Sequence, residues 1–119
     1  MNATRSATET PPPAAHGVAA AAAWFLSQKT LPRHQTVALF ANDFTRYLER
    51  LIPQIEQMAA AHPDDAAQAV AARAGVDEAL QRLSLAHRPG LNGEVERVKR
   101  LARSVVALRT HYEKLGGRP

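Results

Sequence analysis

The chain has 119 residues, enough for one domain and too few for a catalytic domain beside a regulatory one. It contains no cysteine, which excludes disulfide bonds, thiolate metal sites and cysteine nucleophiles and fits a cytoplasmic protein. The net charge of +4 is modest, and we expect most of it to serve solubility.

The N-terminal residues 1–16 are polar and contain three consecutive prolines, Pro11 to Pro13. The sequence therefore predicts a disordered tail over residues 1–16 and a single helical domain over residues 17–116. The apolar run Val18–Leu26 is too short for a membrane span, which takes about 20 residues. It also lacks the basic start and cleavage site of a signal peptide, so we expect no membrane association.

Residues Gly17–Lys29 are rich in alanine and end in a bulky apolar group that contains Trp24, which predicts the first helix. Residues Arg33–Ala61 predict the second helix, because their apolar side chains recur every three or four positions. Pro53 lies inside this pattern and predicts a kink or a break. Since the apolar phase continues unchanged across Pro53, one bent helix is favoured.

Residues Asp64–Ala86 predict a third helix whose apolar face consists mostly of alanine. We expect Asp64 and Asp65 to cap its start, because carboxylates accept hydrogen bonds from the free N–H groups there. Gly75 lies inside the predicted helix, where glycine costs about 1 kcal/mol relative to alanine. Either a neighbouring helix crosses closely at Gly75 or the helix bends there.

Residues Pro89–Gly116 predict a long amphipathic helix that ends at Gly116-Gly117. Short turns at Leu31–Arg33, His62–Asp64 and His87–Asn92 favour antiparallel neighbours. The predicted fold class is all-α: an antiparallel helical bundle of three long helices plus a shorter N-terminal helix. The expected core consists of Trp24, Phe40, Phe44, Leu48, Leu51, Ile55, Val76, Leu80, Leu83, Val98, Leu101, Val105, Leu108 and Tyr112.

The sequence contains no pattern that indicates catalysis or cofactor binding. No second histidine lies one helical turn from His111, and no Glu-x-x-His motif or glycine-rich phosphate loop is present. Ser104 has no base within a helical turn in the sequence, although a base could come from elsewhere in the fold. We therefore expect no enzyme activity, no metal and no cofactor.

Two surfaces are candidates for binding. The first is an interface with a second copy or another protein, for which the candidate residues are Phe40, Tyr47, His111 and Tyr112. The second is a basic face on the last helix, formed by Arg97, Arg100 and Arg103. It lacks the polar and aromatic side chains that read bases, so nucleic-acid binding is the less favoured use.

Three functions follow from these candidates. The leading hypothesis is a non-enzymatic interaction or accessory protein that forms a homodimer. The alternatives are a module that binds nucleic acid or a regulator, and a bundle that binds a small ligand near Tyr47, His111 and Tyr112.

Several blocks of the chain resemble the actinobacterial domain-of-unknown-function family catalogued under number 6415, which is labelled a natural product biosynthesis protein. The blocks are Leu31-Pro-Arg33 with Thr36-Val37, Leu51-Ile-Pro-Gln-Ile-Glu56, Pro89-Gly-Leu91, Leu101-Ala-Arg-Ser-Val-Val-Ala-Leu108, His111-Tyr-Glu113 and Leu115. The resemblance covers about Thr30–Leu115 and implies an association with secondary metabolism, with no activity to carry over. The family often has Cys-Asp where this chain has Arg109-Thr110, which argues against a catalytic thiol.

Overall fold

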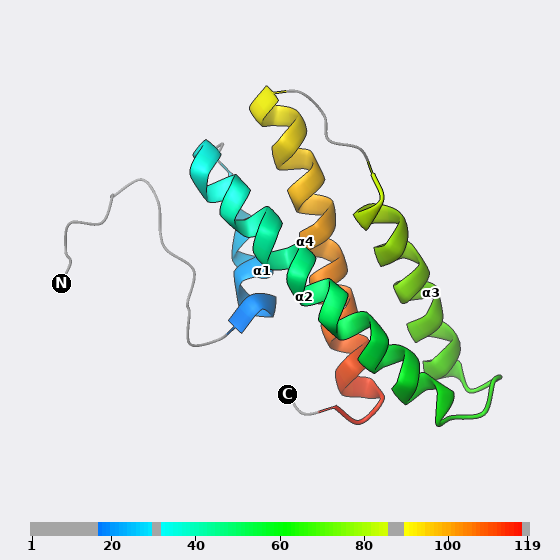
Figure 1. Ribbon diagram of the computed structural model, residues 1–119. Coiled ribbons are helices and arrows are strands. Elements are labelled where there is room, and N and C mark those ends of the chain that lie inside the picture. Colours follow the sequence, from blue (N-terminus) through cyan, green and yellow to red (C-terminus); the bar gives the residue numbers. More distant parts are fainter. Residues whose placement is uncertain (1–16, 30–31, 86–89, 118–119) are drawn as a thin grey trace.

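The computed structural model describes residues 17–29, 32–85 and 90–117. These residues form four helices and no strand: α1 (Gly17–Ser27), α2 (His34–Ala60), α3 (Ala67–Leu83) and α4 (Gly90–Lys114) (Figure 1). The predicted all-α bundle of three long helices and a shorter first one is confirmed. The tail predicted at 1–16 and parts of the first and last predicted turns lie outside the described residues.

Consecutive helices run in opposite directions, and α4 lies at the centre of the bundle (Figure 1). α4 packs against α1, α2 and α3, whereas no contact joins the described residues of α1 and α3. α1 and α3 therefore occupy opposite flanks of α4. None of the described helices is both long and apolar enough to cross a membrane.

α2 continues as one helix through Pro53, as the unbroken apolar phase predicted. The Pro53 side chain is exposed, while Leu51, Ile52 and Ile55 on either side of it are buried. Side chains satisfy the carbonyl groups at the C-terminal end of α2. His62 Nδ1 bonds to the Met58 carbonyl oxygen at 3.0 Å, and Arg73 Nη2 of α3 donates to the Ala59 carbonyl at 3.4 Å.

The start of α3 differs from the prediction. Ala66 is the residue before the first helical turn, and no side chain caps it. The Ala66 N–H bonds to the Pro63 carbonyl at 3.0 Å, so a separate turn occupies the positions where we expected the helix to begin. The prediction that Asp64 and Asp65 cap α3 is therefore wrong. Asp64 instead accepts Arg73 at its carbonyl (3.2 Å) and pairs with it at its carboxylate (3.7 Å).

α3 and α4 approach each other closely at Gly75. A Cβ atom on Gly75 would lie 2.9 Å from His111 Cδ2 and 3.3 Å from Leu108 Cδ2. Of the two alternatives predicted for Gly75, the close crossing of a neighbouring helix is therefore the correct one. The neighbouring alanines Ala72 and Ala79 are fully buried, so small side chains continue this contact along α3. Leu80 was expected in the core but is 46% exposed, because only α2 and α4 cover α3.

Aromatic rings join α1 to α2. Phe25 of α1 is fully buried and meets Phe40 and Phe44 of α2 edge-on, with ring centroids 5.5 and 6.1 Å apart. Phe40 and Phe44 stack on each other at 5.4 Å, and Trp24 tilts onto Phe40 at 5.5 Å. Trp24 is only partly buried, so Phe25 is the residue that anchors α1.

The C-terminal end of α4 is closed by two glycines, as predicted. The Gly116 N–H bonds to the Glu113 carbonyl at 3.1 Å, and the Gly117 N–H bonds to the Tyr112 carbonyl at 2.8 Å. Gly116 has a φ of +109°, a conformation that residues with a side chain rarely adopt. This pair of bonds is the Schellman arrangement, which satisfies carbonyl groups that the helix leaves free.

Acidification should destabilise the bundle through His111. Burial against α3 lowers the pKa of His111 from its ordinary value of 6.5, and Lys114 lowers it further. Because the unfolded chain then binds the proton more readily, this contribution to stability is complete above pH 6.5 and is lost as the pH falls below it. We expect His111→Gln to flatten the fall in the free energy of unfolding between pH 7.5 and 5, measured by urea denaturation. An equally steep fall in the variant would contradict this.

Candidate functional site

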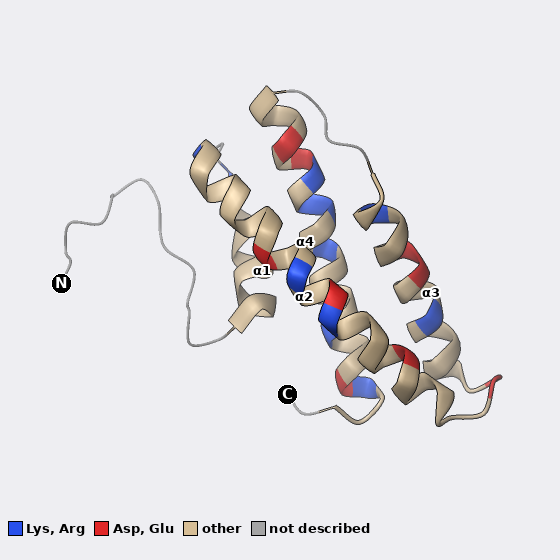
Figure 2. Ribbon diagram, in the orientation of Figure 1, with Lys and Arg blue, Asp and Glu red and all other residues tan. Residues whose placement is uncertain are grey.

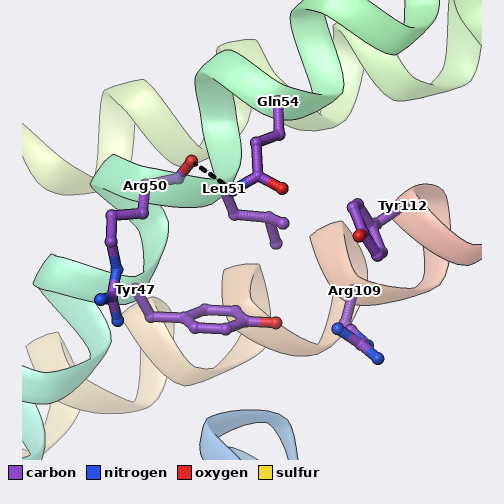
Figure 3. A pocket seen from close by; sticks show the side chains of 6 residues that line it. All are labelled: Tyr47, Arg50, Leu51, Gln54, Arg109 and Tyr112. Carbon is purple, nitrogen blue, oxygen red and sulfur yellow. Dashed lines mark hydrogen bonds between the residues drawn. The ribbon is translucent and has the colours of Figure 1, made fainter. Parts of the chain in front are cut away.

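A groove on the surface between α2 and α4 is the best candidate for a binding site (Figure 3). Its volume is about 310 Å³, at the lower end of the range for small-molecule sites. We call it the tyrosine–arginine groove; its lining residues are Tyr47, Arg50, Leu51, Gln54, Arg109 and Tyr112. Among the six there is one aliphatic side chain and no carboxylate, so the lining is aromatic and cationic.

Helical spacing accounts for this lining. The four residues from α2 lie at positions i, i+3, i+4 and i+7, which fall on one face of a helix. Arg109 and Tyr112 of α4 are three residues apart and face them. Leu51 is 5% exposed and forms the apolar floor, since it continues the core stripe of α2 to the edge of the bundle.

Arg109 is held in place by three side chains. Its Nε donates to Glu113 Oε2 at 3.1 Å, and its guanidinium carbon lies 5.2 Å from the centre of the Tyr112 ring. The Tyr47 hydroxyl points towards it across the groove (Figure 3). Desolvation alone would lower the pKa of Arg109, but hydrogen bonds from the guanidinium to Tyr47 and Glu113 raise it above its ordinary value. Arg109 is therefore a fixed positive charge at the edge of the groove.

The Tyr112 ring is positioned from both sides. Arg109 covers one part of it, and the backbone of Gly117 packs so closely that a side chain there would overlap the ring. The Schellman turn at the end of α4 therefore also shapes one wall of the groove. This wall depends on the glycine pair Gly116-Gly117, which the sequence analysis had identified only as the end of the last helix.

Arg50 and Gln54 lie at the opposite, α2 side of the groove (Figure 3). The Gln54 amide nitrogen donates to the Arg50 carbonyl at 3.3 Å, which leaves the amide oxygen turned towards the groove. The Arg50 side chain is exposed and forms no ion pair with any residue in the described ranges. Its charge is therefore available to a bound molecule.

The structure separates the four residues of the candidate interface. Tyr47 and Tyr112 line the same groove, although they are 65 positions apart in the chain. His111 instead packs on Gly75 at the α3 side of α4. Phe40 is 5% exposed within the aromatic core, so its surface is not available to a partner in this fold.

The basic face on α4 does not form as one surface. Arg97 has a side chain only 11% exposed and pairs with Glu94 at 3.2 Å, so it turns towards the interior. Arg100 is partly buried and Arg103 is exposed. Along α4, acidic residues lie near the start, basic residues follow one another through the middle, and an acidic residue appears again near the end (Figure 2).

Ser104 does not have the surroundings of a nucleophile. It is buried, and Arg82 Nη1 donates to its hydroxyl at 3.0 Å, while Arg82 Nη2 pairs with Glu78 at 3.0 Å. A cation cannot accept the hydroxyl proton, so Arg82 is not a general base. In the part of the chain that the structure describes, no three His, Asp or Glu side chains gather to hold a metal ion.

A second hollow of about 300 Å³ lies between α2 and α3, where Arg73 and Asp77 form part of the lining. Arg73 already serves the structure there, because it bonds to the Ala59 and Asp64 carbonyls. From the sequence we did not predict that Arg50, Gln54 or Arg109 would line a pocket with the tyrosines. Helical spacing could have indicated them. Arg50 and Gln54 follow Tyr47 by three and seven residues, and Arg109 precedes Tyr112 by three, so each lies on the same helix face as a tyrosine.

A family model described as a family of unknown function, DUF6415, matches residues 16–117. This match spans most of the chain and agrees with the resemblance seen in the sequence. Neither a curated protein nor a solved structure matches the chain.

Proposed function

Because this chain belongs to DUF6415, a family of unknown function, we propose a function for it from the geometry of its surface. The proposed function is that of a non-enzymatic interaction protein whose binding site is the tyrosine–arginine groove. A cytoplasmic location and an accessory role in actinobacterial secondary metabolism are part of this proposal, and both come from the sequence.

One observation carries the proposal: two tyrosines and two arginines from different helices line one open hollow. Tyrosine and arginine are the side chains that most often supply binding energy at protein interfaces. Arg109 and the Tyr112 ring are also held in place by the chain itself. A partner therefore loses little free energy in ordering them.

Small organic probes test the position of the site. We expect phenol, added to isotopically labelled protein, to shift the amide NMR signals of residues 47–54 and 109–117 most strongly. The reason is that a ring can insert between the tyrosines above the apolar floor. Shifts centred on the hollow between α2 and α3, near Ile55 and Val76, would contradict the choice of groove.

Self-association is the second candidate, and exposed apolar side chains at the C-terminal end of α3 favour it. Leu80 is 46% exposed and Leu85 is 44% exposed. If a second copy covers them, light scattering on a size-exclusion column should give the dimer mass, and Leu80→Glu should return the monomer mass. A monomer at all concentrations in both proteins would rule out self-association through these exposed leucines.

A further inference from the structure

We propose that the chain's own proline run, Pro11-Pro12-Pro13, binds in the tyrosine–arginine groove and controls access to it. This inference rests on the proposed function, because it assigns a form of regulation to the same site. The run lies outside the described residues, and three residues separate it from Gly17, the first residue of α1.

The hydrogen-bonding groups of the groove suit a proline segment. The lining contains the Arg50 guanidinium and the hydroxyls of Tyr47 and Tyr112, all of which can donate, and it contains no carboxylate. A proline residue has a carbonyl oxygen but no N–H, and the polyproline II helix forms no internal hydrogen bonds. The proline run therefore presents acceptors to a surface that is rich in donors.

The apolar part of the groove also suits this segment. The rings of Tyr47 and Tyr112 lie around Leu51, which forms the floor (Figure 3). Grooves lined by aromatic side chains bind proline-rich segments, because the polyproline II helix is preformed and loses little conformational entropy on binding. The rings of the proline run can pack on the tyrosines while its carbonyl groups meet the donors.

The start of α1 brings the proline run to the correct end of α4. α1 and α4 pack against each other and run in opposite directions, so Gly17 lies towards the C-terminal half of α4 (Figure 1). Arg109 and Tyr112, which form the α4 wall of the groove, belong to the same half. Each residue of a polyproline II helix adds about 3.1 Å, so the chain from Pro11 to Gly17 can span about 19 Å.

Glu9 supplies a charge that matches Arg50. It is the only acidic residue among residues 1–16 and precedes the proline run by two positions. The Arg50 guanidinium lies at the end of Tyr47 that is remote from Arg109 (Figure 3), and it forms no ion pair with any residue in the described ranges. A segment that enters the groove from α4 and passes along Tyr47 therefore brings Glu9 to Arg50.

The covalent link makes a weak contact sufficient. Because a short linker joins the proline run to α1, its effective concentration at the groove is on the order of millimolar. Contacts too weak to hold a free tripeptide therefore still occupy the groove within the chain. A partner that uses the groove has to displace the run, which lowers the partner's apparent affinity.

The first test is a spin label on the full chain. The chain contains no cysteine, so Ala7→Cys provides a single attachment site. We expect a nitroxide at this position to broaden the amide NMR signals of residues 47–54 and 109–112 more strongly than those of α3. Replacement of all three prolines of the run by glycine should remove the difference, since glycine keeps the length and charge of the segment but not its polyproline II preference.

Matched variants control this result. Replacement of Asn2, Ala3 and Thr4 by glycine changes the same number of residues and should leave the broadening at the groove unchanged. Absence of broadening at the groove in the protein with prolines would overturn the inference, as would equal broadening in the proline-to-glycine variant. Broadening that arises only between a labelled molecule and a second, unlabelled one would overturn the contact within one chain.

A charge swap tests the direction of the segment. Glu9→Arg and Arg50→Glu should each lower the ratio of bound to free proline run about two- to fivefold, the size expected for one exposed ion pair. The double variant should restore the ratio. Arg46 is an exposed arginine one turn before Arg50 and outside the lining, so Arg46→Glu makes the same change in net charge and should have less effect. Equal effects of Arg46→Glu and Arg50→Glu would overturn the assigned direction and with it the inference.

Phenol separates a failure of this inference from a failure of the proposed function. We expect phenol to bind at the groove more tightly in the proline-to-glycine variant than in the unchanged chain, because the competing segment is lost. Equal binding at the groove in both proteins would overturn the inference and leave the proposed function intact. Absence of binding at the groove in both proteins would overturn the proposed function as well.

Discussion

Replacement of Phe44 by alanine should lower the free energy of unfolding by about 3–5 kcal/mol, as expected for a large aromatic side chain removed from a core. Phe44 is fully buried, stacks on Phe40 at 5.4 Å and meets Phe25 edge-on. The substitution therefore removes contacts between α1 and α2 as well as within α2. Since domains are stable by only about 5–15 kcal/mol, much of the stability would be lost.

Urea denaturation followed by circular dichroism measures this effect. Leu39→Ala provides the control on the same helix, because Leu39 is 59% exposed. It should change the free energy of unfolding by no more than about 0.5 kcal/mol. A loss below about 1 kcal/mol in Phe44→Ala would mean that the aromatic cluster does not anchor α1, since a fully buried phenylalanine costs more than that.

Replacement of Ala79 by leucine should destabilise the bundle by about 1–3 kcal/mol through overpacking. Ala79 is fully buried on α3, the helix that approaches α4 closely at Gly75. A leucine at this position has no space unless α3 moves away from its neighbours. Leucine and alanine both favour helix, so helix propensity contributes little to the change.

The exposed Ala71 on the same helix provides the comparison for this second variant. Ala71→Leu should leave the midpoint of thermal unfolding close to that of the wild type, while Ala79→Leu should lower it by several degrees. Equal midpoints for the two variants would show that α3 can move outward without cost. The small residues of α3 would then have no role in its packing.

The sequence predicted α2 and α4 well because their apolar stripes are wide and regular. Leu48, Leu51, Ile55, Leu101, Val105 and Leu108 are all buried, as the spacing of apolar residues required. The glycine pair after α4 was also correctly interpreted, since a Schellman turn depends on local sequence. These features are set within a few residues of chain and need no knowledge of the partner helix.

α3 was predicted less well, because its burial depends on which sides its neighbours cover. Its alanine face gives little periodic signal, and Leu80 lies on the side that neither α2 nor α4 reaches. The start of α3 was placed too early, since the turn closed by Ala66 and Pro63 competes with the cap expected at Asp64. Both errors come from tertiary contacts that the local pattern does not contain.

Only the two tyrosines of the groove were predicted from the sequence. Tyr47 and Tyr112 were chosen as surface aromatics, but the sequence does not give the rotation of α2 against α4 that makes them neighbours. The same rotation brings Arg109 to Tyr47 and leaves the Arg97 side chain only 11% exposed. The rotation of α4 about its own axis thus decides which of its arginines reach the groove. It also decides whether Tyr112 lies beside Tyr47.

The central position of α4 has a consequence for synthesis on the ribosome. α4 is the last of the described helices to emerge, yet it is the helix against which all the others pack. Until Gly90–Lys114 has left the exit tunnel, α1 and α3 have no shared neighbour except α2, and the apolar stripe of α2 stays partly uncovered. The nascent chain must therefore complete its core after synthesis of this segment, and a ribosome stalled before residue 90 would present an incomplete, chaperone-accessible intermediate.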